Sequence, residues 1–163
     1  MSDGGDGRLI GIAVRSGYRA PMKTRERALV TAAAGVEGDY RGAKYPRRAV
    51  TVLASEAWEA ALEALGVPGI QWTARRANLL VEGAALPRAA GGIVRIGAVM
   101  LEVTGQTSPC SRMEEVRPGL LRALAPDWRG GITCRVVEDG HVALGDAVEI
   151  LVSPPERKIR LPG

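Results

Sequence analysis

The sequence predicts a mainly β protein, in which short strands curl into a β-barrel and only a few short helices are added. Two observations favour this fold class. Short apolar, β-branched runs recur along the chain between glycine-rich turns and give about seven or eight strand candidates. The regular alternation of strands and helices that a doubly wound fold requires does not occur in the sequence.

The first strands are predicted in the N-terminal third of the chain. Residues 8–15 contain Leu9-Ile10-Gly11-Ile12-Ala13-Val14, a run typical of a strand. Residues 16–27 are polar and basic and contain Pro21, so we expect a loop there. Further strands are expected over residues 28–34 and 49–53. Between them, residues 36–42 are punctuated by glycine, which permits positive φ in a turn.

Residues 55–65 give the clearest helix signal. Ser55 is the expected N-cap and Gly66 the expected C-terminal stop. Trp58, Leu62 and Leu65 recur at i, i+4 and i+7, which places them on one apolar face. Trp58 is therefore predicted to be a core residue and not a stacking platform for a ligand.

The second half of the chain is predicted to continue as strands. They are expected over residues 78–81, 93–96 and 98–103, the last two separated at Gly97 or forming one bent strand. A short helix is expected over 118–124. Residues 132–137 and 142–151 are predicted to form a hairpin around 138–141, with an interruption at Gly145-Asp146. His141 is then an ordinary exposed turn residue.

Length and composition predict one domain of ordinary globular character. The chain has 163 residues, of which 46% are hydrophobic and 25% charged. We expect a disordered N-terminus over residues 1–7, the barrel domain over 8–152 and a flexible tail over 153–163. No apolar run approaches the roughly 20 residues that span a bilayer, and the acidic, glycine-rich start is unlike a signal peptide. A cytoplasmic protein is therefore expected.

The charge of the chain favours an anionic ligand. The net charge is +4, and lysine occurs only as Lys23, Lys44 and Lys158, so nearly all basic residues are arginine. Arginine forks suit phosphate and carboxylate groups, although a general bias toward Arg, Ala and Gly explains part of this composition. Nucleic acid is a disfavoured partner because aromatic residues make up 4% of the chain, with no Phe. The only plausible stacking platform is the tyrosine set Tyr18, Tyr40 and Tyr45.

The most informative stretch is Gln106-Thr107-Ser108-Pro109-Cys110-Ser111-Arg112-Met113, which places a cysteine on a polar turn. Ser111 and Glu114 have the spacing of a capping box, so Cys110 is expected one residue before a helix. The positive end of that helix and the charge of Arg112 favour the thiolate, which attacks electrophiles and binds metals. The alternative is an inert, buried thiol, as most free cysteines are.

Other common sites are not supported by the sequence. Cys134 is expected in a strand as a structural residue. Cys110, Cys134 and His141 do not have the spacing of a zinc site. Gly91-Gly92 and Gly130-Gly131 do not precede helices as a phosphate-binding fingerprint requires, so a nucleotide loop is rejected.

Several short pieces occur in order along the chain. They are Gly38-Asp39-Tyr40-Arg41-Gly42, Arg48 before a strand, Arg76-Ala77-Asn78-Leu79 with Gly83 after it, Ile96-Gly97 before Leu101-Glu102-Val103-Thr104, Pro109-Cys110, Arg129-Gly130-Gly131 leading to Arg135-Val136-Val137, and Gly145-Asp146. This series resembles the MOSC domain, named for the C-terminal domain of molybdenum cofactor sulfurases, over residues 8–151.

The resemblance implies a MOSC-like, pyruvate-kinase-barrel-like fold with one functional cysteine, here Cys110. In this family the cysteine carries sulfur as a persulfide or ligates the molybdenum of a pterin cofactor. The implied activity is that of a molybdenum-cofactor-dependent oxidoreductase, reducing N-hydroxylated compounds with a separate electron donor, or of a sulfur carrier or transferase served by a sulfur donor protein. The family is also associated with pyridoxal phosphate. A stand-alone member is expected, because the sequence contains no aminotransferase-like domain and no iron–sulfur cysteine set.

The resemblance and the residue chemistry together give a candidate site. Arginine side chains and Asn78 are predicted to hold the cofactor's phosphate and pterin, with surface exposure or a role in the barrel wall as the alternatives. For Asp39, holding the loop backbone is the favoured interpretation. The candidate cofactor-binding residues are Arg48, Arg76, Asn78, Arg112, Thr107 and Asp39, and Cys110 is the candidate catalytic and metal-ligating residue. A non-catalytic binding module for an anionic ligand or nucleic acid is the alternative function.

Overall fold

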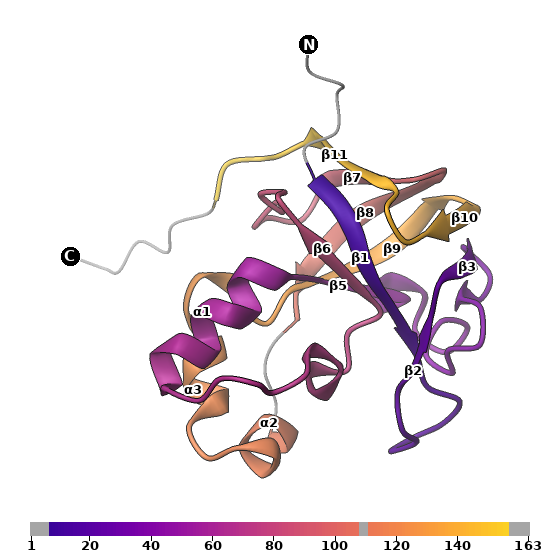
Figure 1. Ribbon diagram of the computed structural model, residues 1–163. Coiled ribbons are helices and arrows are strands. Elements are labelled where there is room, and N and C mark those ends of the chain that lie inside the picture. The colour runs from indigo at the N-terminus through magenta and orange to yellow at the C-terminus, as the bar shows by residue number, and fades with distance from the viewer. Residues whose placement is uncertain (1–6, 108–110, 157–163) are drawn as a thin grey trace, which may run out of the picture.

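Strands account for most of the described chain in the computed structural model, which describes residues 7–107 and 111–156 (Figure 1). The strands are β1 (Gly7–Val14), β2 (Lys23–Arg25), β3 (Arg27–Thr31), β4 (Gly35–Val36), β5 (Val50–Ala54), β6 (Leu79–Glu82), β7 (Ile93–Ile96), β8 (Val99–Gln106), β9 (Ile132–Glu138), β10 (Gly140–Ala143) and β11 (Ala147–Val152). The helices are α1 (Ser55–Leu65), α2 (Ser111–Val116) and α3 (Leu120–Leu124), with 3-10 turns η1 (Pro46–Arg48), η2 (Trp72–Arg75) and η3 (Pro126–Trp128).

Seven strands close into a barrel in the order β1, β11, β7, β8, β9, β5 and β6. The closing pair is β1 with β11, through Gly7 opposite Val148 and Arg8 opposite Ala147. Neighbouring barrel strands are antiparallel except β5 and β6, which are parallel and are connected through α1. A second sheet of β10, β3 and β4 lies beside the barrel. The predicted fold class, a mainly β barrel with a few short helices, is confirmed.

Alternation along the strands builds the barrel core. In β8, for example, Val99, Leu101 and Val103 are buried while the residues between them are partly exposed. This period of two is expected when one face of a strand points into the barrel. The main core cluster consists largely of Val, Leu and Ile from the barrel strands and β3.

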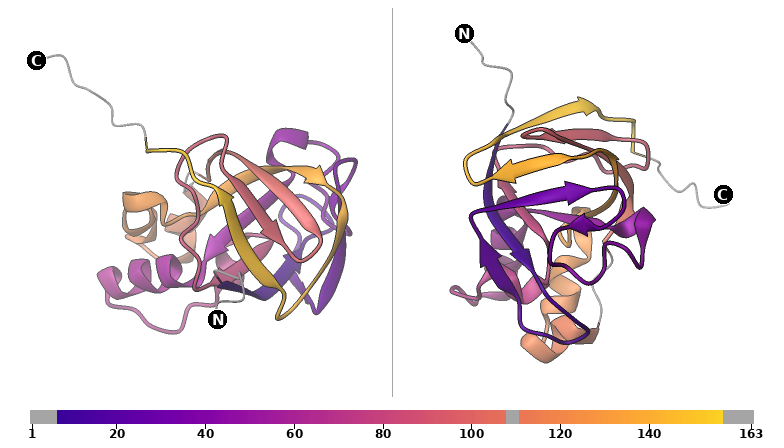
Figure 2. Two further views of the ribbon diagram at one scale, coloured as in Figure 1. Left: turned by 90° about the horizontal axis from the view of Figure 1, so that it is seen from above. Right: turned by 90° about the vertical axis from the view of Figure 1, so that its right-hand side faces the viewer.

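A second core lies between the barrel wall and the helices. Trp58 and Leu62 of α1 pack there with Met113 of α2 and with Leu120 and Leu124 of α3. The indole Nε1 of Trp58 donates to the carbonyl of Ile70 at 3.0 Å, so its one polar atom is satisfied. Figure 2 shows the three helices gathered to one side of the barrel. Trp58 is therefore a core residue, as predicted.

The helix over residues 55–65 has the predicted bounds, but its N-terminus differs from the prediction. Gly66 ends it with φ 75°, and its N–H donates to Glu63. Ser55 is the first helical residue and not the N-cap, because Ala54 leaves β5 in an extended conformation and takes the cap position without a side-chain hydrogen bond. The strand runs directly into the helix, which leaves no loop in which a serine cap could form.

Three further expectations need correction, each because a long-range contact decides the structure. Residues 16–27 are not all loop, since β2 pairs with the end of β1. The predicted hairpin of 132–137 with 142–151 does not form: β10 pairs with β3, and β11 pairs with β7 and β1. His141 is exposed but lies in β10 opposite Leu29, and not in a turn.

Glu114 does not complete a capping box with Ser111. Its carboxylate accepts hydrogen bonds from the backbone N–H groups of Gly119 at 2.9 Å and Leu121 at 3.3 Å, so it supports the start of α3. The helix that begins at Ser111 spans six residues. Among the described residues, no helix is both long enough and apolar enough to cross a membrane.

Candidate anion-binding site

A small cavity lies where β1, the loop after β4, η2, the end of β8 and α2 meet. Its volume is about 60 Å³, which is room for a few water molecules or one compact oxyanion. The lining residues are Arg15, Arg41, Thr51, Arg75, Arg76, Ala77, Thr107, Arg112 and Met113. Five of these are arginines, and none of the described lining residues is acidic, so we call this cavity the arginine pocket.

Distant segments of the chain supply the arginines. Arg15 follows β1 directly, Arg41 lies in the loop after β4, and Arg112 is the second residue of α2. Arg76 follows η2 in a left-handed conformation with φ 67°, which is uncommon for a residue other than Gly. Its Nη2 donates to the carbonyl of Ala20 at 2.6 Å. The strained backbone at Arg76 marks a position where the fold holds a side chain against its local preference.

Arg75 fixes the backbone next to the pocket. Its side chain is buried, and its Nε donates to Gly130 at 3.0 Å while its Nη2 donates to Thr107 at 2.9 Å. Both acceptors are backbone carbonyls. Arg75 thus holds the chain at Thr107, directly before the segment that carries Cys110, and ties it to the turn before β9.

Three buried polar atoms in the pocket have no hydrogen-bond partner. They are Arg76 Nε, Thr107 Oγ1 and Arg112 Nη1, and all three residues line the arginine pocket. These are the only buried side-chain nitrogen or oxygen atoms without a partner in residues 7–107 and 111–156. A buried donor without an acceptor carries a cost of about 1–3 kcal/mol. Two guanidinium groups and a hydroxyl can all donate, so the pocket is built for an acceptor-rich, anionic group.

The charges of the pocket oppose one another. Burial, followed by the positive charges of Arg15 and Arg112, lowers the pKa of Arg76 to about 10. Burial also lowers the pKa of Arg15; the charges of Arg41 and Arg112 add to this effect, while Tyr40 and Asp39 oppose it. The Arg15 guanidinium lies 5.0 Å from the centre of the Tyr40 ring. The surroundings therefore disfavour the positive charge of the pocket's guanidinium groups, which nevertheless stay charged. A bound anion would offset this unfavourable charge.

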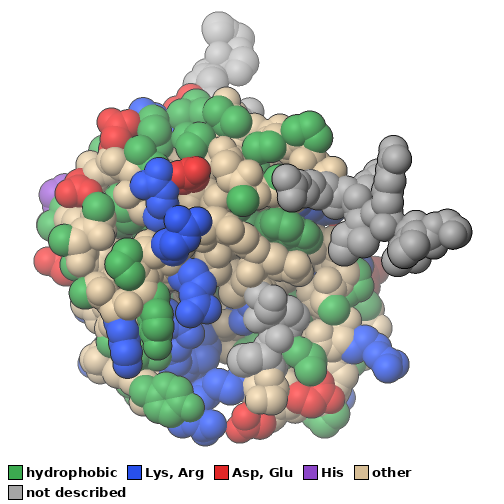
Figure 3. Space-filling view, turned by 180° about the vertical axis from the view of Figure 1, so that it is seen from behind, with side chains coloured by type: hydrophobic (Ala, Val, Ile, Leu, Met, Phe, Trp, Pro, Cys, Tyr) green, Lys and Arg blue, Asp and Glu red, His purple; other side chains and the backbone are tan. Residues whose placement is uncertain are grey.

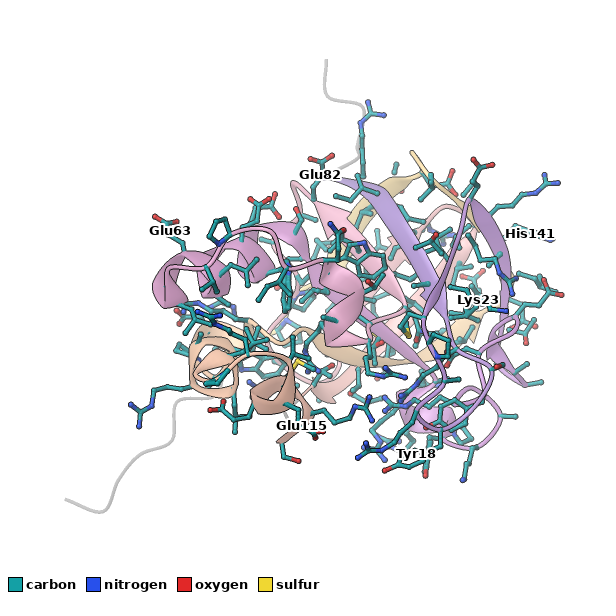
Figure 4. The ribbon with its side chains drawn as sticks, turned by 60° about the horizontal axis from the view of Figure 1, so that its bottom comes forward. Tyr18, Lys23, Glu63, Glu82, Glu115 and His141 are labelled. Carbon is teal, nitrogen blue, oxygen red and sulfur yellow. The ribbon has the colours of Figure 1, made fainter. Side chains whose placement is uncertain are left out.

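The basic character extends beyond the pocket. Figure 3 shows Lys and Arg side chains forming a band down one face of the molecule. In Figure 4, nitrogen-bearing side chains gather between Tyr18 and Glu115. Tyr18 and Tyr45 also have cations over their rings, from Arg19 and from Lys44 and Arg48 respectively. The tyrosines thus pack with arginine and lysine instead of offering bare stacking faces.

The structure places the six predicted cofactor-binding residues in different environments. Arg76, Thr107 and Arg112 line the arginine pocket together. Arg48 does not line it; its side chain is exposed and its guanidinium lies 5.1 Å from the Tyr45 ring centre. Sequence reasoning missed Arg15 and Arg41 as pocket residues, and it gave Arg75 no role. The signals for them were local: Arg15 ends the first predicted strand, and Arg41 stands in the motif Gly38-Asp39-Tyr40-Arg41-Gly42, which was given no role in binding for its arginine.

Asn78 and Asp39 hold the scaffold around the pocket. Asn78 is buried; its Oδ1 accepts from the N–H of Thr51 at 3.1 Å, and its Nδ2 donates to Ala13 at 3.2 Å. This is the barrel-wall alternative among the two roles expected for it. Asp39 accepts from the N–H of Arg15 at 3.0 Å and of Arg41 at 3.3 Å, so one carboxylate fixes both backbone segments.

The two cysteines differ in what the structure describes. Cys110, the predicted catalytic and metal-ligating residue, lies outside the described residues, as do Ser108 and Pro109. Thr107, before the segment that is not described, and Arg112, two residues after Cys110, both line the arginine pocket. Cys134 is fully buried in β9, and burial raises the pKa of its thiol. Among the described residues, no group of three or more His, Cys, Asp or Glu side chains could hold a metal ion.

Comparison with known proteins identifies the class of this barrel. The family model of the MOSC domain matches residues 38–149, which is more than half of the chain, so the chain belongs to the MOSC domain family. No curated protein sequence matches it.

Solved structures show the same fold at low sequence identity. The YuaD protein from Bacillus subtilis has a TM-score of 0.74 at 20% identity, covering 87% of this chain and 93% of its own. YiiM from Geobacillus stearothermophilus has a TM-score of 0.69 at 18% identity, covering 90% and 75%. YiiM from Escherichia coli has a TM-score of 0.65 at 18% identity, covering 91% and 72%.

Proposed function

We propose that this MOSC-domain protein binds a molybdenum–pterin cofactor, whose phosphate enters the arginine pocket and whose metal takes Cys110 as a ligand. The observation that carries the proposal is the set of three unpartnered donors, Arg76 Nε, Thr107 Oγ1 and Arg112 Nη1, around one cavity. A phosphate supplies acceptors for all three donors and charge for the arginines. The volume of about 60 Å³ suits such an oxyanion, and in this proposal the pterin lies outside the cavity.

The chain's own residues have separate tasks in this proposal. Arg76 and Arg112 bind the phosphate oxygens, and Thr107 donates its hydroxyl. Arg75 and Asp39 position them through the backbone, because Arg75 holds Thr107 and Asp39 holds Arg15 and Arg41. The thiolate of Cys110 is a soft ligand of the kind that suits this metal centre.

When bound, the cofactor would supply two-electron oxygen-atom transfer, the chemistry that reduction of an N-hydroxylated compound requires, with electrons from a separate donor. The pocket residues do not themselves transfer protons in this scheme, since guanidinium groups remain protonated near neutral pH. Their task is to fix the cofactor by its anionic end, so that its reactive part lies at a set distance from Cys110.

The two alternative functions share the pocket but not the metal. In one, Cys110 carries sulfane sulfur and passes it to an acceptor thiolate, with the pocket binding an anionic group of a partner. In the other, the barrel binds an anionic ligand without catalysis. Reactivity at Cys110 separates the first from the second, because only sulfur carriage requires the thiol.

The test is molybdenum analysis of protein co-expressed with the pterin biosynthesis machinery. We compare the wild type with Arg76→Gln, Cys110→Ser and Arg95→Gln; Arg95 is a matched control because it lies on β7 in a surface ion pair with Glu138. Near-stoichiometric molybdenum in the wild type and Arg95→Gln, with loss in the other two variants, would support the proposal.

Other outcomes contradict the proposal in distinct ways. Molybdenum retained by Arg76→Gln would remove the pocket from cofactor binding. Molybdenum retained by Cys110→Ser would remove the thiol as a ligand. No molybdenum in any of the four proteins would overturn the cofactor, and cyanide-releasable sulfur on wild type but not on Cys110→Ser would then identify a sulfur carrier.

A further inference from the structure

A second cavity lies beside the turn that leads into β9, outside the arginine pocket. Its volume is about 710 Å³, which is in the range of small-molecule sites. It is lined by Trp128, by Gln106 at the end of β8 and by the ion pair of Arg88 with Glu156, together with alanine, glycine and proline residues. Trp128 is the only aromatic residue among its described lining residues, so we call this cavity the Trp128 cleft.

A strained turn holds the indole of Trp128 at the cleft. Asp127 and Trp128 both have a φ of 54°, and two successive residues other than Gly rarely adopt this left-handed conformation. The turn closes where the N–H of Gly131 donates to the carbonyl of Trp128 at 3.0 Å. The indole is half-buried: it packs against the main core cluster and also borders the cleft. The fold thus fixes a flat aromatic side chain at the cleft against the local preference of the backbone.

The Trp128 cleft has no net charge among its described lining residues, in contrast to the arginine pocket. Arg88 and Glu156 are the only charged side chains among these residues, and they pair with each other at 3.5 Å. Arg88 also lies 3.8 Å from the carboxylate of Asp127. A phosphate or carboxylate ligand would have to compete with both carboxylates for Arg88, so the cleft favours an uncharged ligand.

Two side chains of the cleft have polar groups available to a ligand. The indole Nε1 of Trp128 and the side-chain amide of Gln106 make no hydrogen bond to a residue within 7–107 or 111–156. The indole N–H can only donate, whereas the amide both donates and accepts. A heteroaromatic ring has donors and acceptors along its edge and faces that stack on an aromatic side chain. The cleft therefore suits a flat ring of this kind.

The Trp128 cleft and the arginine pocket lie on opposite sides of the chain at the end of β8. Gln106 lines the cleft and Thr107 lines the pocket, as expected for successive residues of an extended chain. The buried guanidinium of Arg75 donates to the carbonyls of Thr107 and Gly130, and so holds the end of β8 next to the turn that carries Trp128. A ring in the cleft therefore lies beside the chain that leads to Cys110.

We propose that the Trp128 cleft binds an uncharged, planar heteroaromatic ring, with one face on the indole of Trp128 and its edge at the amide of Gln106. The identity of the ring rests on the proposed function, which supplies two sources of this chemistry. One source is the pterin of the cofactor, which lies outside the arginine pocket. The other is a substrate that carries its N-hydroxyl group on a heteroaromatic ring.

Calorimetric titration of the full-length protein with 6-hydroxymethylpterin and with adenine tests this proposal. Both probes are flat heteroaromatic compounds, uncharged near neutral pH and without phosphate. Trp128→Leu removes the stacking face and should weaken binding of the tighter probe about tenfold. Gln106→Ala removes the contact at the edge of the ring and should weaken it about fivefold. Gln71→Ala, at an exposed glutamine outside the cleft, and Arg76→Gln in the arginine pocket are matched controls that should retain wild-type affinity.

Either probe can support the proposal, and their comparison identifies the source of the ring. Tighter binding of the pterin assigns the cleft to the cofactor, and equal or tighter binding of adenine assigns it to a substrate. No binding of either probe to the wild type at millimolar concentration would overturn the proposal, as would wild-type affinity in Trp128→Leu or Gln106→Ala. Gln106→Ala removes no side-chain hydrogen bond between described residues, so it decides the test even if Trp128→Leu does not fold.

The outcome of this titration is independent of the molybdenum analysis. The two probes contain neither phosphate nor metal, so they do not require the arginine pocket or Cys110. Loss of ring binding in Trp128→Leu with no molybdenum in any protein would retain the cleft and reject the cofactor. Molybdenum bound through Arg76 and Cys110 without any ring binding would retain the proposed function and reject the cleft.

Discussion

Inorganic phosphate should stabilise this protein through the arginine pocket, and the structure sets the size of the effect. Burial and the neighbouring positive charges lower the pKa of Arg76 to about 10, and the difference from the ordinary guanidinium pKa corresponds to about 3 kcal/mol of unfavourable charge before solvent screening. Because Arg76 is partly exposed, screening by solvent reduces this unfavourable free energy to about 1–2 kcal/mol. The sign is fixed: a cation with a lowered pKa destabilises the fold while it is charged, and the cost disappears only as the pH rises above about 10. At pH 7.5 an anion must relieve it instead.

The affinity for phosphate follows from the donors. Two charge-assisted hydrogen bonds of about 2 kcal/mol each give a Kd on the order of 1 mM. Phosphate at about 50 mM then adds about 2.3 kcal/mol to the free energy of unfolding. For a chain of this length that corresponds to a rise in Tm of about 5–9 °C.

The assay is thermal unfolding in low-salt buffer at pH 7.5, with phosphate compared with sodium chloride at equal ionic strength. We expect Arg76→Gln and Arg112→Gln to lose most of the phosphate-dependent rise, while Arg95→Gln retains it. An equal rise in all three variants, or the same rise with chloride, would refute the assignment of the pocket. A higher Tm of Arg76→Gln without phosphate would further support the repulsion inferred among the arginines.

Three more predictions follow from single residues. Asn78→Ala should lower Tm by about 6–12 °C, because it leaves the buried N–H of Thr51 unpaired, yet it should retain the phosphate-dependent rise; loss of that rise would give Asn78 a direct role in the pocket. Gly42→Ala should destabilise the loop that carries Arg41, since the added Cβ would collide with the carbonyl of Ala34, and should weaken phosphate binding about tenfold. Calorimetric titration with phosphate measures the affinity, and a wild-type value would contradict this prediction. Cys134 should resist a thiol reagent at pH 8 in the folded protein and react in urea, because burial raises its pKa; labelling of Cys134 at the same rate in both states would show that β9 opens readily.

Local signals in the sequence predicted what local interactions decide. The helix over 55–65 has the predicted bounds because its apolar period and Gly66 lie within the segment itself. The break at Gly97 between β7 and β8 is likewise local, since glycine accepts its φ of 58°. The hairpin predicted for residues 132–151 failed because barrel closure draws β11 to β7 and β1, and no pattern within the segment reports those partners.

The same distinction between local and long-range interactions applies to the candidate anion-binding site. Arg76, Thr107 and Arg112 were expected as ligand residues from their motifs, and the barrel brings them to one cavity. Arg15 and Arg41 were missed because the contact that gathers them is long-range. Asp39 was predicted to hold the backbone of its own loop, as it does at Arg41, but it also binds the N–H of Arg15, 24 residues away.

The unfavourable charge of the pocket is itself an argument for a resident anion. Arginine side chains can usually reach water, and here the fold keeps Arg76 half-buried, on a strained backbone, close to Arg15 and Arg112. Such an arrangement lowers the stability of the empty protein and offers no compensating contact among the described residues to Arg76 Nε or Arg112 Nη1. Binding an oxyanion converts the same charges from a cost into an attraction without rearranging the barrel. A surface patch of arginines could bind phosphate weakly. Only a pocket that is preorganised before binding lowers the stability of the protein in favour of affinity for the ligand.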